Sequence, residues 1–177
     1  MRTGARGSLA VLVVAALLTG GCGAGGPGPQ AWASAVCEAL TPWRSEIGTL
    51  AERTQQQMNM KTTPAQAKEN LVRLFGGAES ASEAARAGVV EAGVPSVDGG
   101  DRVASGFVAS LSAVRDAYGR AKTGIEALPT SPADAFYTQV SAVVTTLNQE
   151  YGKSALDTST LDSVELKRAF DEVPECR

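Results

Sequence analysis

The sequence of 177 residues contains no histidine, the most common general base and metal ligand in proteins. Nucleophilic sites that pair serine or cysteine with histidine are therefore excluded, and so is the Glu-x-x-His pattern of di-iron bundles. None of the five lysines follows a serine at the Ser-x-x-Lys spacing. The nineteen acidic residues allow many carboxylate pairs, but none stands out as a glycosidase site. We expect a protein that is not an enzyme and has no catalytic residues.

Aromatic residues make up only 5% of the chain, and no run of Lys or Arg occurs. A surface that binds nucleic acid needs clustered basic residues to displace phosphate counterions, and the net charge here is −3. We therefore expect no nucleic-acid partner. The hydrophobic fraction of 44% is enough for a folded core, and Ala, Val and Leu supply most of it. This composition favours an all-α fold.

The longest apolar run of the chain lies near its amino terminus, where Arg2 and Arg6 precede the ten apolar residues Leu9–Leu18. A ten-residue helix is about 15 Å long, roughly half of the hydrocarbon core of a bilayer, so we expect no permanent membrane span. A positive start followed by a short apolar run is typical of a secretory signal peptide. We place this signal peptide at residues 1–21.

The residues that follow, Leu18-Thr19-Gly20-Gly21-Cys22, resemble the lipobox of bacterial lipoproteins, with Thr19 at the position where Leu is usual. The resemblance implies cleavage before Cys22 and attachment of a lipid to its thiol. Ordinary secretion with a spare thiol at Cys22 is the alternative. Residues 22–30 are rich in Gly and Pro, which indicates a flexible tether after the lipidated cysteine. The expected location is the extracytoplasmic face of the cell membrane, with the lipid as the membrane partner.

The chain has three cysteines, and an odd number in a secreted protein needs an explanation. Lipidation of Cys22 leaves Cys37 and Cys176, which we expect to form one disulfide in an oxidising compartment. In the chain-entropy model a loop of this length adds roughly 5 kcal/mol of stability, as an upper figure. Two thiols without histidine make a poor zinc site, and Met58 and Met60 alone make a weak Cu(I) site. We expect no metal and no cofactor.

Residues 31–177 have the pattern of one domain of amphipathic helices. Apolar residues recur every three or four positions over Trp32–Leu50, which predicts a first helix. Within it, Thr41-Pro42 predicts a kink or a restart with Thr41 as the cap, because proline removes a backbone donor. Thr63-Pro64 predicts the start of a second helix, with threonine as the cap and proline in the first turn.

The pattern predicts two further long helices and a short last one. Asp101 is expected to cap the third helix, which Pro129 ends, and the fourth is expected to begin after Ser131-Pro132 with Asp134 in a capping box. A last segment, at about 161–173, is expected to pack beside the first helix. Short connections favour antiparallel neighbours. We therefore predict an antiparallel four-helix bundle with a short fifth helix, stapled by the disulfide.

Both ends of the domain resemble a known group of proteins. The segment Trp32–Trp43, with Cys37 inside it, and the carboxyl-terminal segments Leu166–Phe170 and Pro174–Cys176 are similar to those of small secreted proteins and lipoproteins of actinobacteria. The resemblance implies a helical domain attached to the cell envelope with an end-to-end disulfide. This group has no common assigned activity, so the resemblance implies a location and no reaction.

Two functions remain open at this point. The first is a non-enzymatic binding or structural module whose exposed helical faces contact another envelope protein or the cell wall. The second is a carrier or sensor that holds a small apolar ligand between the helices, where small side chains leave space. The residues expected to line that cavity are Ala78, Ala81, Ala85, Phe107 and Tyr118.

Overall fold

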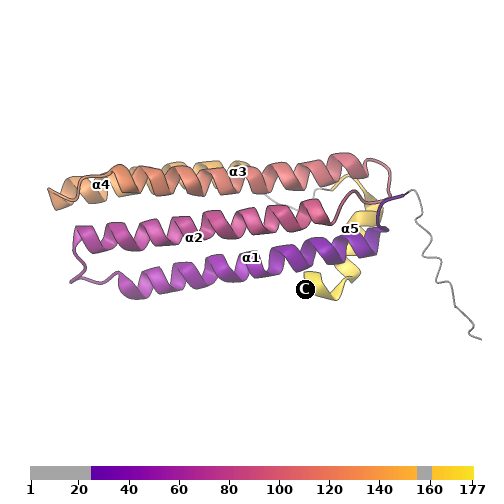
Figure 1. Cartoon of the computed structure of the whole chain (residues 1–177), viewed down its shortest axis with the longest axis horizontal. Coiled ribbons are helices and arrows are strands. Elements are labelled where there is room, and N and C mark those ends of the chain that lie inside the picture. Colours follow the sequence, from indigo (N-terminus) through magenta and orange to yellow (C-terminus); the bar gives the residue numbers. More distant parts are fainter. Residues whose placement is uncertain (1–24, 155–160) are drawn as a thin grey trace, which may run out of the picture.

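The computed structural model describes residues 25–154 and 161–177. Its elements are α1 (Pro29–Gln57), α2 (Pro64–Glu91), α3 (Gly100–Ala127), α4 (Ala133–Lys153), α5 (Val164–Glu172) and a final 3-10 helix, η2 (Pro174–Cys176). No strand occurs within these two ranges. The predicted all-α fold, an antiparallel helical bundle with a short fifth helix, is confirmed (Figure 1).

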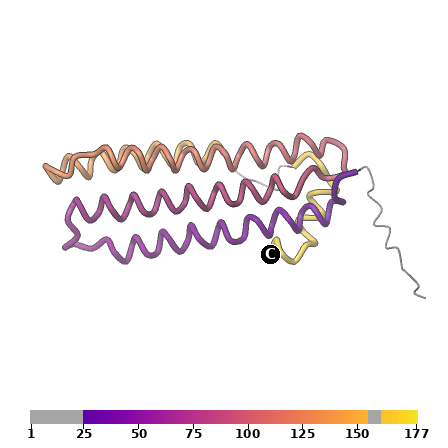
Figure 2. The backbone as a smooth tube through the Cα atoms, viewed as in Figure 1, coloured from indigo at the N-terminus to yellow at the C-terminus, as the bar shows by residue number. Residues whose placement is uncertain are grey.

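The helices run back and forth between two ends of an elongated bundle. The proximal end is where α1 begins, and it also carries the α2–α3 loop (92–99) and α5 (Figure 1). The distal end carries the α1–α2 loop (58–63) and the α3–α4 loop (128–132). Helix α2 packs against both α1 and α3, and α4 packs mainly on α3. Figure 2 shows the carboxyl-terminal segment turning back to lie beside α1, as predicted for the last helix.

Helix starts follow the sequence signals in some places and depart from them in others. The capping box at Thr63 is present, with Gln66 as its second member. Helix α1, in contrast, continues through Pro42, so the predicted restart is wrong. Thr41 is not a cap either, because its hydroxyl donates a hydrogen bond to the carbonyl of Glu175 at 3.3 Å. Pro42 is exposed, and the residues Leu40 and Trp43 on either side of it are buried. The helix therefore stays intact at the proline.

Two other predicted caps are also wrong. The cap of α3 is Gly99, whose φ of 70° lies in the left-handed region that glycine adopts without strain, and Asp101 lies in the first turn. Helix α4 follows Pro132 without a side-chain cap, so Asp134 does not form a capping box. Both aspartates still lie close to the positive end of a helix dipole, where a carboxylate is favourable.

The core at the proximal end is built around three aromatic rings. Trp32 contacts Phe107 and Phe170 edge-on, with ring centroids 5.5 and 5.9 Å apart, and the two phenylalanines stack on each other. Each ring comes from a different helix: α1, α3 and α5. The main buried residues of this proximal core are Trp32, Ala33, Val36, Leu40, Trp43, Ala85, Val89, Phe107, Leu111, Val114, Leu166 and Phe170.

The core at the distal end is smaller and has fewer contributors. Its buried residues come from α2, α3 and α4: Leu71, Phe75, Ala117, Ala121, Ile125 and Leu147. Helix α4 is the least buried of the four long helices, and only Phe136 and Leu147 on it are buried. Much of α4 is therefore surface.

Candidate functional site

The predicted disulfide joins Cys37 on α1 to Cys176 in η2, with Cα atoms 5.1 Å apart and 139 residues of separation. It fastens the carboxyl terminus to the proximal end of the bundle. Its formation uses two of the three cysteines in the chain. The third, Cys22, is the predicted lipidation site and lies outside the described residues, as does the predicted signal peptide.

The chain enters the domain through close contacts with the α2–α3 loop. The carbonyl of Pro27 accepts a hydrogen bond from the backbone N–H of Ser96 at 2.8 Å. A Cβ atom on Gly26 would lie 1.8 Å from the carbonyl oxygen of Val94, so only glycine fits there. Residues 26 and 27 are therefore packed against the α2–α3 loop, although both lie in the segment 22–30 that we expected to be a flexible tether.

The five residues predicted to line an apolar cavity are packed among core side chains, and four of them lie in or against the proximal core. Ala85 and Phe107 belong to the proximal core, and Ala81 packs at its margin. Tyr118 lies farther along α3, where its ring stacks on Phe75 at 6.4 Å. Burial is the main reason, and the nearby Tyr151 a further one, that the pKa of Tyr118 is raised to about 12, so its phenol is neutral at physiological pH.

Ala78, the remaining residue of that set, is fully buried, and a ring from α1 bonds the residue one turn farther along α2. The indole of Trp43 donates a hydrogen bond to the hydroxyl of Ser82 at 3.0 Å, and that hydroxyl donates to the carbonyl of Ala78 at 2.7 Å. The large ring from α1 thus occupies the level where α2 carries small residues. The sequence pattern did not single out Ser82 as a core residue.

A shallow apolar groove lies instead between α3 and α4, with a volume of about 250 Å³. It is lined by Ala117, Arg120, Ala121, Ala142, Val143, Thr146, Leu147 and Glu150. Arg120 and Glu150 form an ion pair of 3.0 Å across its edge. Thr146 donates its hydroxyl to the carbonyl of Ala142 at 3.1 Å, which satisfies that polar group within the helix. The groove has room for a small apolar group.

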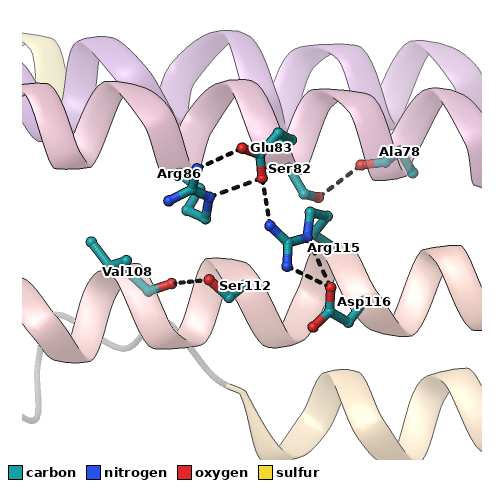
Figure 3. Close-up of polar contacts among 8 residues, drawn as sticks. All are labelled: Ala78, Ser82, Glu83, Arg86, Val108, Ser112, Arg115 and Asp116. Atoms are coloured by element: carbon teal, nitrogen blue, oxygen red, sulfur yellow. Dashed lines mark hydrogen bonds and ion pairs between the residues drawn. The ribbon is translucent and has the colours of Figure 1, made fainter.

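The most strongly perturbed carboxylate lies on α2, at the junction of the two cores. Glu83 accepts hydrogen bonds from Arg86 at 2.6 Å and from Arg115 on α3 at 2.7 Å (Figure 3). These two bonds hold the pKa of Glu83 at about 2. Arg115 also pairs with Asp116 at 2.7 Å. Both oxygens of Glu83 are occupied by guanidinium groups, so this cluster clamps α2 to α3 and does not resemble an acid–base site.

Comparisons with known proteins return no match: no family model, no curated protein and no solved structure is significantly similar to this chain. In the ranges that the structure covers, no helix is long and apolar enough to cross a membrane. Within the same ranges, no three His, Cys, Asp or Glu side chains converge as metal ligands.

Proposed function

We propose that this chain is a lipoprotein anchored through Cys22 at the extracytoplasmic face of the cell membrane, and that its bundle is a non-enzymatic binding module of the envelope. The Cys37–Cys176 disulfide is the observation that supports this most directly. Disulfides persist in oxidising compartments, and this pairing leaves Cys22 as the one cysteine available for lipid. The short apolar run Leu9–Leu18 supplies the export signal that such an anchor requires.

The proposal places the two ends of the bundle at different distances from the membrane. Gly26 is four positions after Cys22 in the sequence, a distance that even a fully extended chain covers in at most about 14 Å. The proximal end would therefore lie next to the bilayer. Helix α2 has 28 residues, which makes it about 42 Å long, so the distal end would project away from the membrane toward other envelope components.

Substitution of the lipidated cysteine tests the anchor. We expect Cys22→Ser to move the protein from the membrane fraction to the soluble extracytoplasmic fraction, and mass spectrometry of the wild-type amino-terminal peptide to show the added lipid. The control is the double variant Cys37→Ser/Cys176→Ser, which also replaces cysteines but should stay with the membrane. If the Cys22→Ser protein remains in the membrane fraction, the anchoring proposal is wrong.

The α3–α4 groove favours a second candidate function, a carrier or sensor of a small apolar ligand. Its walls are alanine, valine and leucine side chains, and its volume of about 250 Å³ suits a group smaller than a typical drug. Native mass spectrometry of protein extracted from its own membranes would then show an extra noncovalent mass. Ala142→Trp, which fills the groove, should abolish that mass, whereas Ala109→Trp on the exposed surface of α3 should not.

A further inference from the structure

An open pocket of about 510 Å³ lies at the distal end, where α1 ends and α2 begins. It is lined by Gln57, Asn59, Lys61, Thr62, Gln66, Glu69, Asn70 and Arg73. Every one of these side chains is polar, and four of them are amides. Unlike the apolar groove between α3 and α4, this pocket would recognise a ligand through hydrogen bonds and charge.

Two of the amides use their oxygen atoms to hold Arg73. The guanidinium donates hydrogen bonds to the Oδ1 atom of Asn70 and, at 3.4 Å, to the Oε1 atom of Gln57. Since only an oxygen accepts from a guanidinium, this fixes which end of each amide is the oxygen. The NH₂ groups of Asn70 and Gln57 make no hydrogen bond with any residue in the described ranges.

The other two amides are oriented in the same sense by backbone groups. The Oδ1 atom of Asn59 accepts from the backbone N–H of Lys61 at 2.9 Å. The Oε1 atom of Gln66 accepts from the backbone N–H of Thr63 at 3.0 Å in the capping box. Their NH₂ groups are likewise without a partner among the described residues. In all four amides the oxygen therefore accepts a hydrogen bond from the protein, whereas the NH₂ group donates none to a described residue.

Asn70 is the side chain that points most clearly to a bound group. It is only 7% exposed, yet it lines the pocket. No fully buried side-chain nitrogen or oxygen in the described ranges lacks a hydrogen-bond partner. The NH₂ nitrogen of Asn70 has no partner among the described residues, so it is not fully buried, and Asn70 borders the pocket. A donor on a side chain this buried has few solvent partners, so an acceptor bound in the pocket would satisfy it well.

The charges around the pocket favour a negative ligand. Lys61 and Arg73 both line it, and neither forms an ion pair with a described residue. Glu69 is the only acidic residue of the lining. The first turn of α2 contains no acidic residue, so the positive end of its dipole is not neutralised there. The hydroxyl of Thr62 already accepts a hydrogen bond from the backbone N–H of Asn59 and donates one to the backbone carbonyl of Gln57, so it adds little acceptor capacity to the pocket.

We infer that this distal pocket binds an oxyanion, a phosphate or carboxylate group carried by a soluble or envelope molecule. A neutral polyol fits less well, because each hydroxyl both donates and accepts, and the pocket offers many donors and few acceptors. An oxyanion accepts several hydrogen bonds, and its negative charge would pair with Lys61 and Arg73, which have no acidic partner among the described residues. The inference does not depend on the membrane anchor.

The test uses the full chain, purified in mild detergent and labelled with ¹⁵N, with inorganic phosphate, acetate and glucose as separate probes at constant ionic strength. Phosphate or acetate should shift the side-chain NH₂ signals of Asn70 and its neighbouring amides in a saturable way, and glucose should not. A response to phosphate alone supports a phosphoryl ligand, and a response to both anions supports a carboxylate as well. Absence of a saturable response to either anion, or an equal response to glucose, overturns the inference.

Matched substitutions locate the binding. Asn70→Asp keeps the shape of the side chain and its contact with Arg73 but replaces the donor by a charged acceptor, and we expect affinity for the anion to fall about tenfold or more. Lys61→Gln, in an exposed loop where folding is not at risk, should weaken binding in the same direction. The controls are Asn148→Asp and Lys153→Gln on the exposed face of α4. Equal losses in the controls, or none in the pocket variants, would contradict the assignment.

Discussion

The two ends of the bundle are held together in different ways. At the proximal end, α1, α2, α3 and α5 share one core, three aromatic rings contact each other, and the disulfide closes the chain. At the distal end the core is smaller, it depends on Ala117 and Ala121, and most of α4 faces solvent. Stability is therefore concentrated where the chain enters the domain. The apolar α3–α4 groove and the pocket lined by amides both lie toward the distal end.

Removal of the disulfide should have the largest effect on this difference. Because the bond closes a loop of 139 residues, we expect the variant Cys37→Ser/Cys176→Ser to lose about 3 to 5 kcal/mol of unfolding free energy. Urea unfolding followed by circular dichroism measures the loss. Hydrogen exchange should show that amides of α5 and of the first turns of α1 lose the most protection. Equal loss of protection in α4 would mean that the two ends unfold as one unit.

A matched pair of leucines compares the two cores directly. Leu111 is fully buried in the proximal core, and Leu147 is 7% exposed in the distal core, beside the groove. We expect Leu111→Ala to cost about 4 kcal/mol and Leu147→Ala about 2 kcal/mol, because a site open to solvent relaxes and leaves less cavity. Urea unfolding of both variants under the same conditions gives the comparison. Equal costs would contradict the claim that the distal core is the weaker one.

Alanine substitutions at two glycines of α2 test how closely α1 approaches α2 at two levels of the bundle. A Cβ atom on Gly88 would lie 2.7 Å from the Cβ atom of Ala39, which cannot move without the helix. On Gly77 it would meet the end of the Leu50 side chain, also at 2.7 Å, which can rotate away. We expect Gly88→Ala to destabilise the protein by about 1 kcal/mol, and Gly77→Ala to change its stability little.

The glycine comparison needs a baseline for helix propensity alone. Gly106 in α3 provides it, because a Cβ atom there would meet nothing within 4 Å. We expect Gly106→Ala to raise the melting temperature, with a gain of about 0.5 to 1 kcal/mol. A gain from Gly88→Ala as large as that from Gly106→Ala would show that α1 and α2 separate easily at the proximal end.

The sequence was sufficient for features that depend on one local signal. Cysteine parity predicted the Cys37–Cys176 bond, and Thr63-Pro64 predicted the start of α2. Pro42 was misleading because tertiary contacts outweigh it: Trp32, Leu40 and Trp43 are buried around it, whereas Pro42 itself is exposed. A local propensity rule does not include that burial.

The candidate sites were less predictable, because each depends on how groups are oriented in space. Ala78 and Ala85 suggested room for a ligand, but Trp43 from another helix reaches in to bond Ser82, one turn along α2 from Ala78. The polar residues around Asn59 look like an ordinary loop in the sequence. Their significance comes from the direction in which each amide points, which only the hydrogen bonds reveal.

The smallest expected effect concerns Glu83, which joins α2 to α3 where the two cores meet. Its pKa is lowered from 4.5 to about 2, so the folded protein favours the carboxylate, and its contribution to stability is complete above pH 4.5 and lost as the pH falls toward 2. We expect Glu83→Gln to lower the unfolding midpoint slightly at pH 7, because the pair is partly exposed, and we expect this difference to shrink as the pH falls to 2. The control Glu91→Gln removes an exposed carboxylate that pairs with no described residue. A difference between Glu83→Gln and wild type that persists unchanged to pH 2 would mean that shape, not charge, holds the junction together.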